Sequence, residues 1–279
     1  MTELVFPLAA PRARRAGFAR LVRMELLKLT STRLGYGLLA VSAALTVLWT
    51  SLEASRAGKT NGPAPLSTAA GQTSIIAGGA WGLILATVLG VIISSGEFRH
   101  HTATLTYLAA PDRSRVLAAK AVAGAVGGAV FGLAGYAVAA TVGLAFTAAR
   151  GYHVPIGAIT FVNWGFGHLA AGALLAAIGV TVGSLVRSQL AGVIGVFVWS
   201  IIIESLLGGL FTALRPYLPY TAATTLAGTP LGSASFGPAR STVAVGVPLP
   251  FAAAAALLAA IALTGAAVAA RTTVRRDIT

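Results

Sequence analysis

Few residues of this sequence are of types that could carry out chemistry, and none of them forms a complete catalytic or cofactor-binding set. The chain has no cysteine, which excludes disulfides, thiol catalysis and thiolate metal sites. Gly58-Lys59-Thr60 is similar to the end of a phosphate-binding loop, but that motif requires a preceding strand and a glycine at position 53, where this chain has Glu53. We therefore expect no nucleotide site and no enzymatic activity in this chain.

The histidines lack the partners that a metal or catalytic site requires. His100 and His101 lie near Glu97, but a helical zinc motif has two histidines four residues apart, and adjacent residues of a helix point in different directions. His168 has no acid or second histidine nearby in the sequence. We interpret the first pair as part of a polar loop and His168 as a packed core residue, and we predict neither catalytic residues nor a metal site.

Glu204 is the most unusual single residue, because it interrupts a long apolar stretch. A carboxylate in the middle of a membrane costs about 2.5–3.5 kcal/mol on insertion scales. Glu204 follows Leu190 by 14 residues, which places it roughly 21 Å along a helix and in the outer part of a bilayer core of about 30 Å. It is either a polar group lining a pathway or gate, or part of a helix end that reaches external water, helped by Gly208 and Gly209.

The elements that must position these residues are apolar helices. The 279 residues are 56% hydrophobic and 10% charged, whereas soluble domains carry about 25% charged residues. Continuous apolar runs do not alternate as membrane strands do, so we predict an all-α, polytopic membrane protein. Its six transmembrane helices are expected at about 34–52, 73–95, 116–148, 164–186, 190–211 and 250–270. Glycines recur at every fourth residue in two of these stretches, at Gly124, Gly128 and Gly132 and at Gly179 and Gly183, which favours close helix packing.

Positive charge predicts the orientation. With six crossings, fifteen of the 20 Lys and Arg residues fall on the side of the two termini. The positive-inside rule then places the N-terminal segment 1–33 and the tail 271–279 in the cytoplasm and the six-span bundle 34–270 between them. We predict a multi-pass protein of the bacterial plasma membrane. The net charge of +13 follows from this arrangement, and we expect no nucleic-acid partner.

Residues 16–33 are expected to form a basic amphipathic helix at the membrane interface. Phe18, Leu21, Val22, Leu26 and Leu29 share one face at helical spacing. Arg20 and Arg23 lie opposite, Lys28 and Arg33 add further positive charge, and Glu25 lies inside the apolar stripe. Such a segment before a span is typical of a helix lying in the interface. The alternative is a simple extension of the first transmembrane helix.

Two segments together resemble the ABC transporter type-2 permease family, the membrane subunits of many bacterial exporters. Arg23-Met24-Glu25-Leu26-Leu27-Lys28, with Arg33, is similar to that family's N-terminal elbow helix. The second segment runs from Gly96-Glu97-Phe98-Arg99 to Leu105 and is followed by Leu108, Pro111, Arg113, Arg115 and Lys120; it is similar to the family's cytoplasmic stretch after the second span. His101 stands where the family usually has glycine. The short turn after the fourth span and the long piece before the last span also fit the family plan.

The resemblance implies a division of labour with other chains. The loop would dock on a separate ATPase subunit through coupling residues, namely Glu97, Phe98, Arg99, Thr102, Thr104 and Leu105. Two ATPase copies would hold ATP and Mg, no cofactor would bind this chain, and a second permease copy or homologous permease would complete the unit within membrane lipid. The second and fifth spans would line the substrate path, with Trp81, Phe197, Trp199 and Glu204 as candidates. Short re-entrant helices are expected in the external piece before the last span.

Other classes of membrane protein fit less well. A secondary transporter or channel driven by ion gradients typically has paired broken helices and several intramembrane charges, whereas here Glu204 alone qualifies and no second half mirrors the first. An intramembrane enzyme would require a partnered catalytic set. A loop of mixed charge between residues 96 and 115 favours docking on a protein, because a loop that faces only lipid is expected to be more uniformly basic. The identity of the substrate is left open.

Overall fold

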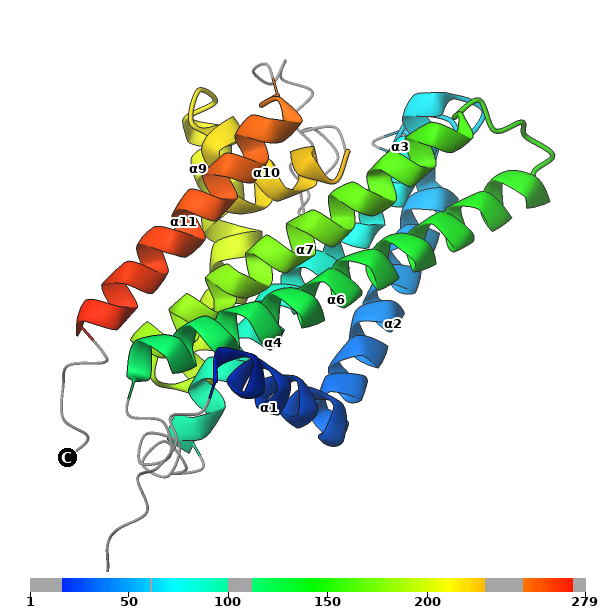
Figure 1. The fold of residues 1–279 in the computed structure, drawn as a ribbon. Coiled ribbons are helices and arrows are strands. Elements are labelled where there is room, and N and C mark those ends of the chain that lie inside the picture. The colour runs from blue at the N-terminus through cyan, green and yellow to red at the C-terminus, as the bar shows by residue number, and fades with distance from the viewer. Residues whose placement is uncertain (1–16, 61, 100–111, 229–247, 273–279) are drawn as a thin grey trace, which may run out of the picture.

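The computed structural model describes residues 17–60, 62–99, 112–228 and 248–272, and all regular structure within these residues is helical. Figure 1 shows the helices in one bundle. In chain order the elements are α1 (Phe18–Ser31), α2 (Arg33–Arg56), α3 (Ala69–Ile76), the 3₁₀ turn η1 (Ala77–Gly79), α4 (Ala80–Arg99), α6 (Arg113–Ala149), α7 (Ala158–Val186), α8 (Gln189–Phe197), the π-helical segment η2 (Val198–Ile203), α9 (Glu204–Leu210), η3 (Arg215–Tyr217), α10 (Pro219–Leu226) and α11 (Phe251–Thr272).

Within the described residues, six helices are long and apolar enough to cross a membrane. They are α2, the continuous run Ala69–Gly96, α6, α7, the run Gln189–Leu210, and α11. The prediction of an all-helical protein with six such helices is confirmed at this level, and it fits a multi-pass membrane protein. Two of the six are not uniform: η1 interrupts the second run and the π-helical η2 interrupts the fifth.

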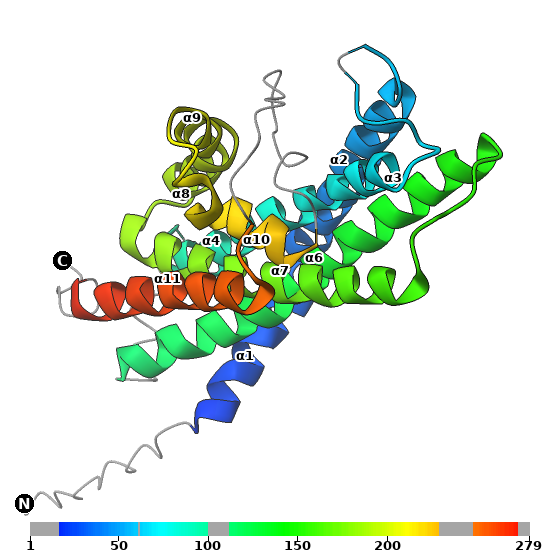
Figure 2. The same cartoon turned by 90° about the horizontal axis from the view of Figure 1, so that it is seen from above.

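The centre of the bundle is built from α4, α6 and α7, which lie side by side in both views (Figures 1 and 2). In the apolar 18-residue core of each span, 89% of the residues are buried in the run containing α4, against 17% in α2 and 11% in α11. Glycines allow this close packing, since a Cβ atom added to Gly128 would meet the carbonyl of Gly172, and one added to Gly179 would meet that of Thr87. The four-residue glycine spacing thus places backbones in direct contact.

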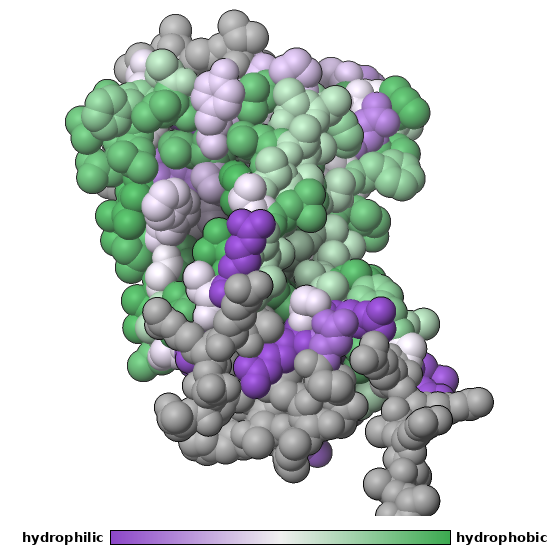
Figure 3. All heavy atoms as spheres, turned by 60° about the vertical axis from the view of Figure 1, so that its left-hand side comes forward, coloured by the Kyte–Doolittle hydropathy of each residue, from purple (hydrophilic) through white to green (hydrophobic). Residues whose placement is uncertain are grey.

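The outer helix α2 is buried on its polar side. The buried residues of α2 are Ser42, Thr46, Thr50, Glu53 and Ala54. Its exposed side chains include Leu48, which is 66% exposed, and Tyr36, which is 62% exposed. A helix on the surface of a water-soluble protein shows the opposite pattern. In Figure 3, apolar side chains cover most of one face, and strongly hydrophilic side chains gather toward its lower end.

The hydrophilic end holds the elements that were expected to share one side of the membrane. α1, the end of α4, the start of α6 and the end of α11 lie toward the same end of the bundle, while α3, α9 and α10 lie toward the other (Figure 1). Several exposed basic residues lie on the first group of elements or at the adjoining start of α2: Arg20, Arg23, Arg33, Arg115 and Arg271. The assignment of this end to the cytoplasm stays a prediction.

The N-terminal segment forms a helix of its own. α1 ends at Ser31, and Thr32 has an extended backbone, with φ −96° and ψ 134°, before α2 begins at Arg33. Of the two alternatives left by the sequence, a separate helix and an extension of the first span, the structure has the separate helix. α1 lies across the lower end of the bundle (Figure 1). Its position at a membrane interface is a prediction that rests on its basic, amphipathic sequence.

Candidate functional site

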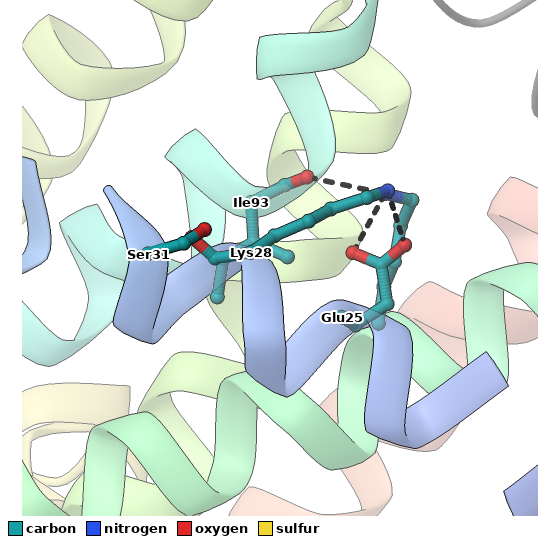
Figure 4. Close-up of polar contacts among 5 residues, drawn as sticks. Glu25, Lys28, Ser31 and Ile93 are labelled. Atoms are coloured by element: carbon teal, nitrogen blue, oxygen red, sulfur yellow. Dashed lines mark hydrogen bonds and ion pairs between the residues drawn. The ribbon is translucent and has the colours of Figure 1, made fainter. Parts of the chain in front are cut away.

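A buried ionic cluster joins α1 to the two helices that flank residues 100–111. The Nζ atom of Lys120 on α6 lies 3.2 Å from Oε2 of Glu25 and donates to the carbonyl oxygen of Ile93 on α4 at 3.4 Å. Lys28 approaches the other carboxylate oxygen, Oε1, at 2.7 Å. The side chains of Lys120 and Glu25 are 5% and 8% exposed, whereas that of Lys28 is 47% exposed. Figure 4 shows the carboxylate held between these groups.

The local sequence of α1 explains the contact between Glu25 and Lys28. Glu25 lies within the apolar stripe of α1, so the face that turns toward the bundle carries a carboxylate, and Glu25 is the residue of α1 that becomes buried. Lys28 follows one turn later and forms an i, i+3 pair. The position of Glu25 in the stripe was the signal of an unusual contact. Its partner Lys120 lies 95 residues away, and sequence reasoning did not connect the two.

The other residues predicted for the interfacial helix face outward. Arg20, Arg23 and Arg33 are exposed, which leaves positive charge on the outer side of α1 and at the start of α2. The five predicted residues therefore divide into three exposed cations, the half-exposed Lys28 and the buried Glu25.

The predicted coupling residues fall at and beyond the end of α4. Glu97, Phe98 and Arg99 are the last residues of α4, and Thr102, Thr104 and Leu105 lie outside the described residues. The chain resumes with Asp112, whose carboxylate caps α6 by accepting from the Ser114 hydroxyl at 2.6 Å and from the Arg115 backbone at 3.3 Å. The hydrogen bond from Ser114, followed by that from Arg115, holds the pKa of Asp112 below its usual value.

A second polar cluster surrounds Glu204 at the opposite end of the bundle. Oε2 of Glu204 accepts the backbone N–H of Tyr220 at 3.1 Å, and Oε1 accepts the N–H and the hydroxyl of Thr221 at 2.5 and 2.9 Å. These donors belong to the first turn of α10, whose N–H groups would otherwise lack partners. Glu204 is 5% exposed, so its carboxylate is satisfied by protein rather than by external water.

Tyr220 extends this cluster to the centre of the bundle. Its hydroxyl donates to Oγ1 of Thr87 on α4 at 2.8 Å. The apolar residues of α10 pack with α7 and α11 in one buried cluster that includes Ala222, Leu226, Ala171, Leu175 and Leu258. The piece before the last span thus contributes a short buried helix, α10. That this piece is external and that its short helices are re-entrant stay predictions.

The other predicted path residues do not gather at one surface. Trp81 and Phe197 are partly buried against the same apolar cluster around α4, and Trp81 packs edge-to-face on Trp49 with ring centroids 6.3 Å apart. Trp199 is 37% exposed. The second and fifth runs were predicted to line the substrate path. Because α4, in the second run, is almost fully covered by the rest of this chain, the fifth run supplies most of the exposed surface of the two.

His168 lies in the core of α7, as the sequence suggested. It is 1% exposed, its ring lies 4.9 Å from that of Tyr136, and its Nδ1 atom is 2.9 Å from the carbonyl oxygen of Trp164. Across the residues that the structure describes, no three His, Asp or Glu side chains come together as a metal-binding group.

Comparison with models of known protein families gives no match, and comparison with curated protein sequences gives none either. The two polar clusters and the arrangement of the helices are therefore the basis for the functional assignment that follows.

Proposed function

We propose that this chain is the transmembrane permease subunit of an ABC exporter. It would form part of the substrate path and couple that path to ATP hydrolysis by a separate subunit. The observation that carries the proposal is α1, a separate amphipathic helix that lies across the basic end of the bundle and packs against α6, whose Lys120 also contacts α4; α4 and α6 are the helices that flank residues 100–111. This agrees with the elbow helix and cytoplasmic loop that the sequence motifs imply.

The surface of the bundle supports lipid as its solvent. Most large exposed side chains on α2, α6, α7 and α11 are apolar, such as Leu48, Val130, Phe166 and Leu263. Polar residues such as Thr46 and Thr50 face inward. Exposed apolar surface on this scale would drive aggregation in water, whereas a bilayer solvates it. The hydrophilic end would then contact the cytoplasm and the ATPase.

The proposed path would form between two permease copies or between this chain and a homologous permease. The run Gln189–Leu210 exposes an apolar stripe of six residues four apart: Leu190, Ile194, Val198, Ile202, Leu206 and Leu210. Trp199 lies beside this stripe. Such a surface suits a hydrophobic substrate or a second copy more than a strongly polar substrate. α10, fixed by Glu204 and Tyr220, would close the path at the external end as a re-entrant helix.

A second candidate, an ion-gradient-driven transporter or channel, is favoured by one observation. The second and fifth runs are both irregular, at η1 and η2, and broken helices mark ion and substrate sites in secondary transporters. Both segments nevertheless keep helical hydrogen bonding, and the carboxylate that directly follows η2, Glu204, is occupied by α10. We therefore rank this candidate second.

Affinity purification tests the proposal. An affinity tag on this chain, expressed in its native cells and extracted in mild detergent, should recover an ATPase with a complete phosphate-binding loop. Reversing a charge at the end of α4, with Glu97→Lys or Arg99→Glu, should reduce that recovery at least fivefold while the permease still inserts. Lys59→Glu at the opposite end is the matched control and should leave recovery unchanged.

The outcomes separate the two candidates. Transport that a protonophore abolishes while ATP is maintained, with no ATPase recovered, would favour the ion-gradient reading. Full recovery of an ATPase by both charge-reversed variants would overturn the placement of the docking site at the end of α4.

A further inference from the structure

We infer that Glu25 and Lys120 are positioning residues: their buried ion pair fastens α1 to the two helices that flank residues 100–111, so that α1 and those helix ends move as one body. The part of this inference that concerns transport rests on the proposed function. The part that concerns the attachment of α1 stands on the geometry alone.

The first step is that the buried residue of α1 is a charged one, beside an apolar contact of Leu29 with the cluster around α4. Glu25 is buried to 6% exposure, while the apolar residues Leu21, Val22, Leu26 and Leu29 around it are only half-buried. Hydrophobic contacts are non-directional and allow a helix to slide or rotate on its support. A charged pair at 3.2 Å has a defined partner and a defined distance, so it fixes the register of α1 on α6.

The second step is that a gain in folding stability does not explain this buried ion pair. Burying two charges costs desolvation free energy, and replacing a buried ion pair by apolar residues of similar size is often neutral or stabilising. Lys28 already neutralises Glu25 from within α1 at 2.7 Å. A second, almost fully buried lysine on another helix therefore adds specificity of position rather than simple neutralisation.

The third step is the place of the partners along the chain. Lys120 is the eighth residue of α6, and Ile93 lies six residues before the end of α4. At 1.5 Å per residue, each is roughly 10 Å from the end of its helix that borders residues 100–111. Lys120 contacts both α1 and α4, so one ammonium group ties the three helices together within two turns of that segment.

Lys120 is unlike the other cations of this end. Arg20, Arg23 and Arg33 are exposed, as expected of side chains that reach toward lipid headgroups or water. The Lys120 side chain is 5% exposed and turns inward. Its role is therefore a contact within the chain rather than an anchor to the membrane surface.

Distance measurements between spin labels test the attachment. The chain has no cysteine, so Met24→Cys on α1 and Val130→Cys on α6, both about half exposed, give one labelled pair without background. In vesicles of neutral and anionic phospholipid, the unmodified ion pair should give a narrow distance distribution. Glu25→Gln or Lys120→Met should broaden it at least twofold. Lys28→Met is the matched control and should leave the width unchanged.

A double variant distinguishes an effect on the position of α1 from an effect on the stability of the fold. Glu25→Leu combined with Lys120→Met replaces the ion pair by apolar side chains and should fold with a melting temperature equal to or above that of the parent, yet still give the broad distribution. A narrow distribution in this variant would show that packing fixes α1 and would overturn the inference. Equal broadening by Lys28→Met would also overturn it, because the buried partner would then have no special role.

The role of the ion pair in transport is tested separately, in the complex of the tagged permease with its ATPase. If α1 follows the loop-bearing helix ends, addition of Mg-ATP should shift the distance from Met24→Cys to Val268→Cys on α11 in the parent, and Glu25→Gln should reduce that shift at least twofold. Recovery of the complex with no Mg-ATP shift in the parent would overturn the proposed transmission. Failure to recover any ATPase would count against the proposed function and would leave the vesicle result to decide the attachment.

Discussion

At the scale of single residues, a carboxylate inside an apolar protein reveals its role by what it touches. Glu204 and Glu25 are both nearly excluded from solvent, at 5% and 6% exposure. Glu204 accepts backbone N–H groups of a helix terminus, where negative charge is favourable. Glu25 accepts from two ammonium groups. The first therefore secures a short helix and the second connects three helices.

Glu204→Gln should destabilise the end of the bundle that holds α9 and α10. Glutamine has one acceptor oxygen, so its amide group would face the N–H of either Tyr220 or Thr221 with a donor. Hydrogen bonds to charged groups contribute about 1.5–3 kcal/mol each, and we expect a lower melting temperature in detergent. Thr221→Val removes the hydroxyl contact alone and should cost less. The assignment fails if Thr221→Val proves more damaging than Glu204→Gln.

At the scale of elements, glycines decide how closely α6 and α7 approach. A Cβ atom at Gly128 would meet both the carbonyl of Gly172 and the side chain of Ala176. Gly128→Val should therefore separate the helices and cost about 1–3 kcal/mol or more, seen as a reduced melting temperature and folded yield. Gly195→Ala on α8 is the control, because nothing lies within 4 Å of the added atom. Equal losses in the two variants would contradict close packing as the cause.

The start of α6 depends on its cap. Asp112→Ala should speed amide hydrogen exchange in residues 113–119 severalfold, whereas Asp112→Asn should preserve protection at neutral pH, because asparagine is an equally good N-cap. The pKa of Asp112 lies below its ordinary value of 3.8. The stabilising contribution of the charged cap is thus complete above that ordinary value and is lost as the pH falls through the lowered pKa. Protection that disappeared already near pH 5 would contradict this account.

At the scale of the whole molecule, the two ends of the bundle differ in charge, and this predicts its orientation. A membrane-impermeant maleimide applied to intact cells should label Tyr152→Cys, in the connection between α6 and α7, and should not label Met24→Cys on α1. Both side chains are exposed, at 42% and 49%, and the chain has no native cysteine. Permeabilised cells provide the control, in which both should react. The opposite pattern would reverse the predicted topology.

The sequence by itself determined the helical class and the approximate places of the six apolar helices, because continuous hydropathy over about 20 residues is a local property. Even so, the local signal was incomplete. The second run begins at Ala69, earlier than the predicted residue 73, because Thr68 caps α3 by accepting from the N–H of Gly71 at 3.1 Å. The turn between the fourth and fifth runs is set by Arg187, whose φ of 58° is left-handed.

Only the tertiary structure decided which polar residues meet. The sequence marked Glu25 as an irregularity in an amphipathic stripe and Glu204 as a carboxylate in an apolar run, but Lys120 and Thr221 are 95 and 17 residues away from them. Pairings at such separations depend on how helices pack, and the packing depends on glycine contacts between α4, α6 and α7. Hydropathy can be calculated from the sequence alone, whereas the partner of a buried charge depends on how the helices pack.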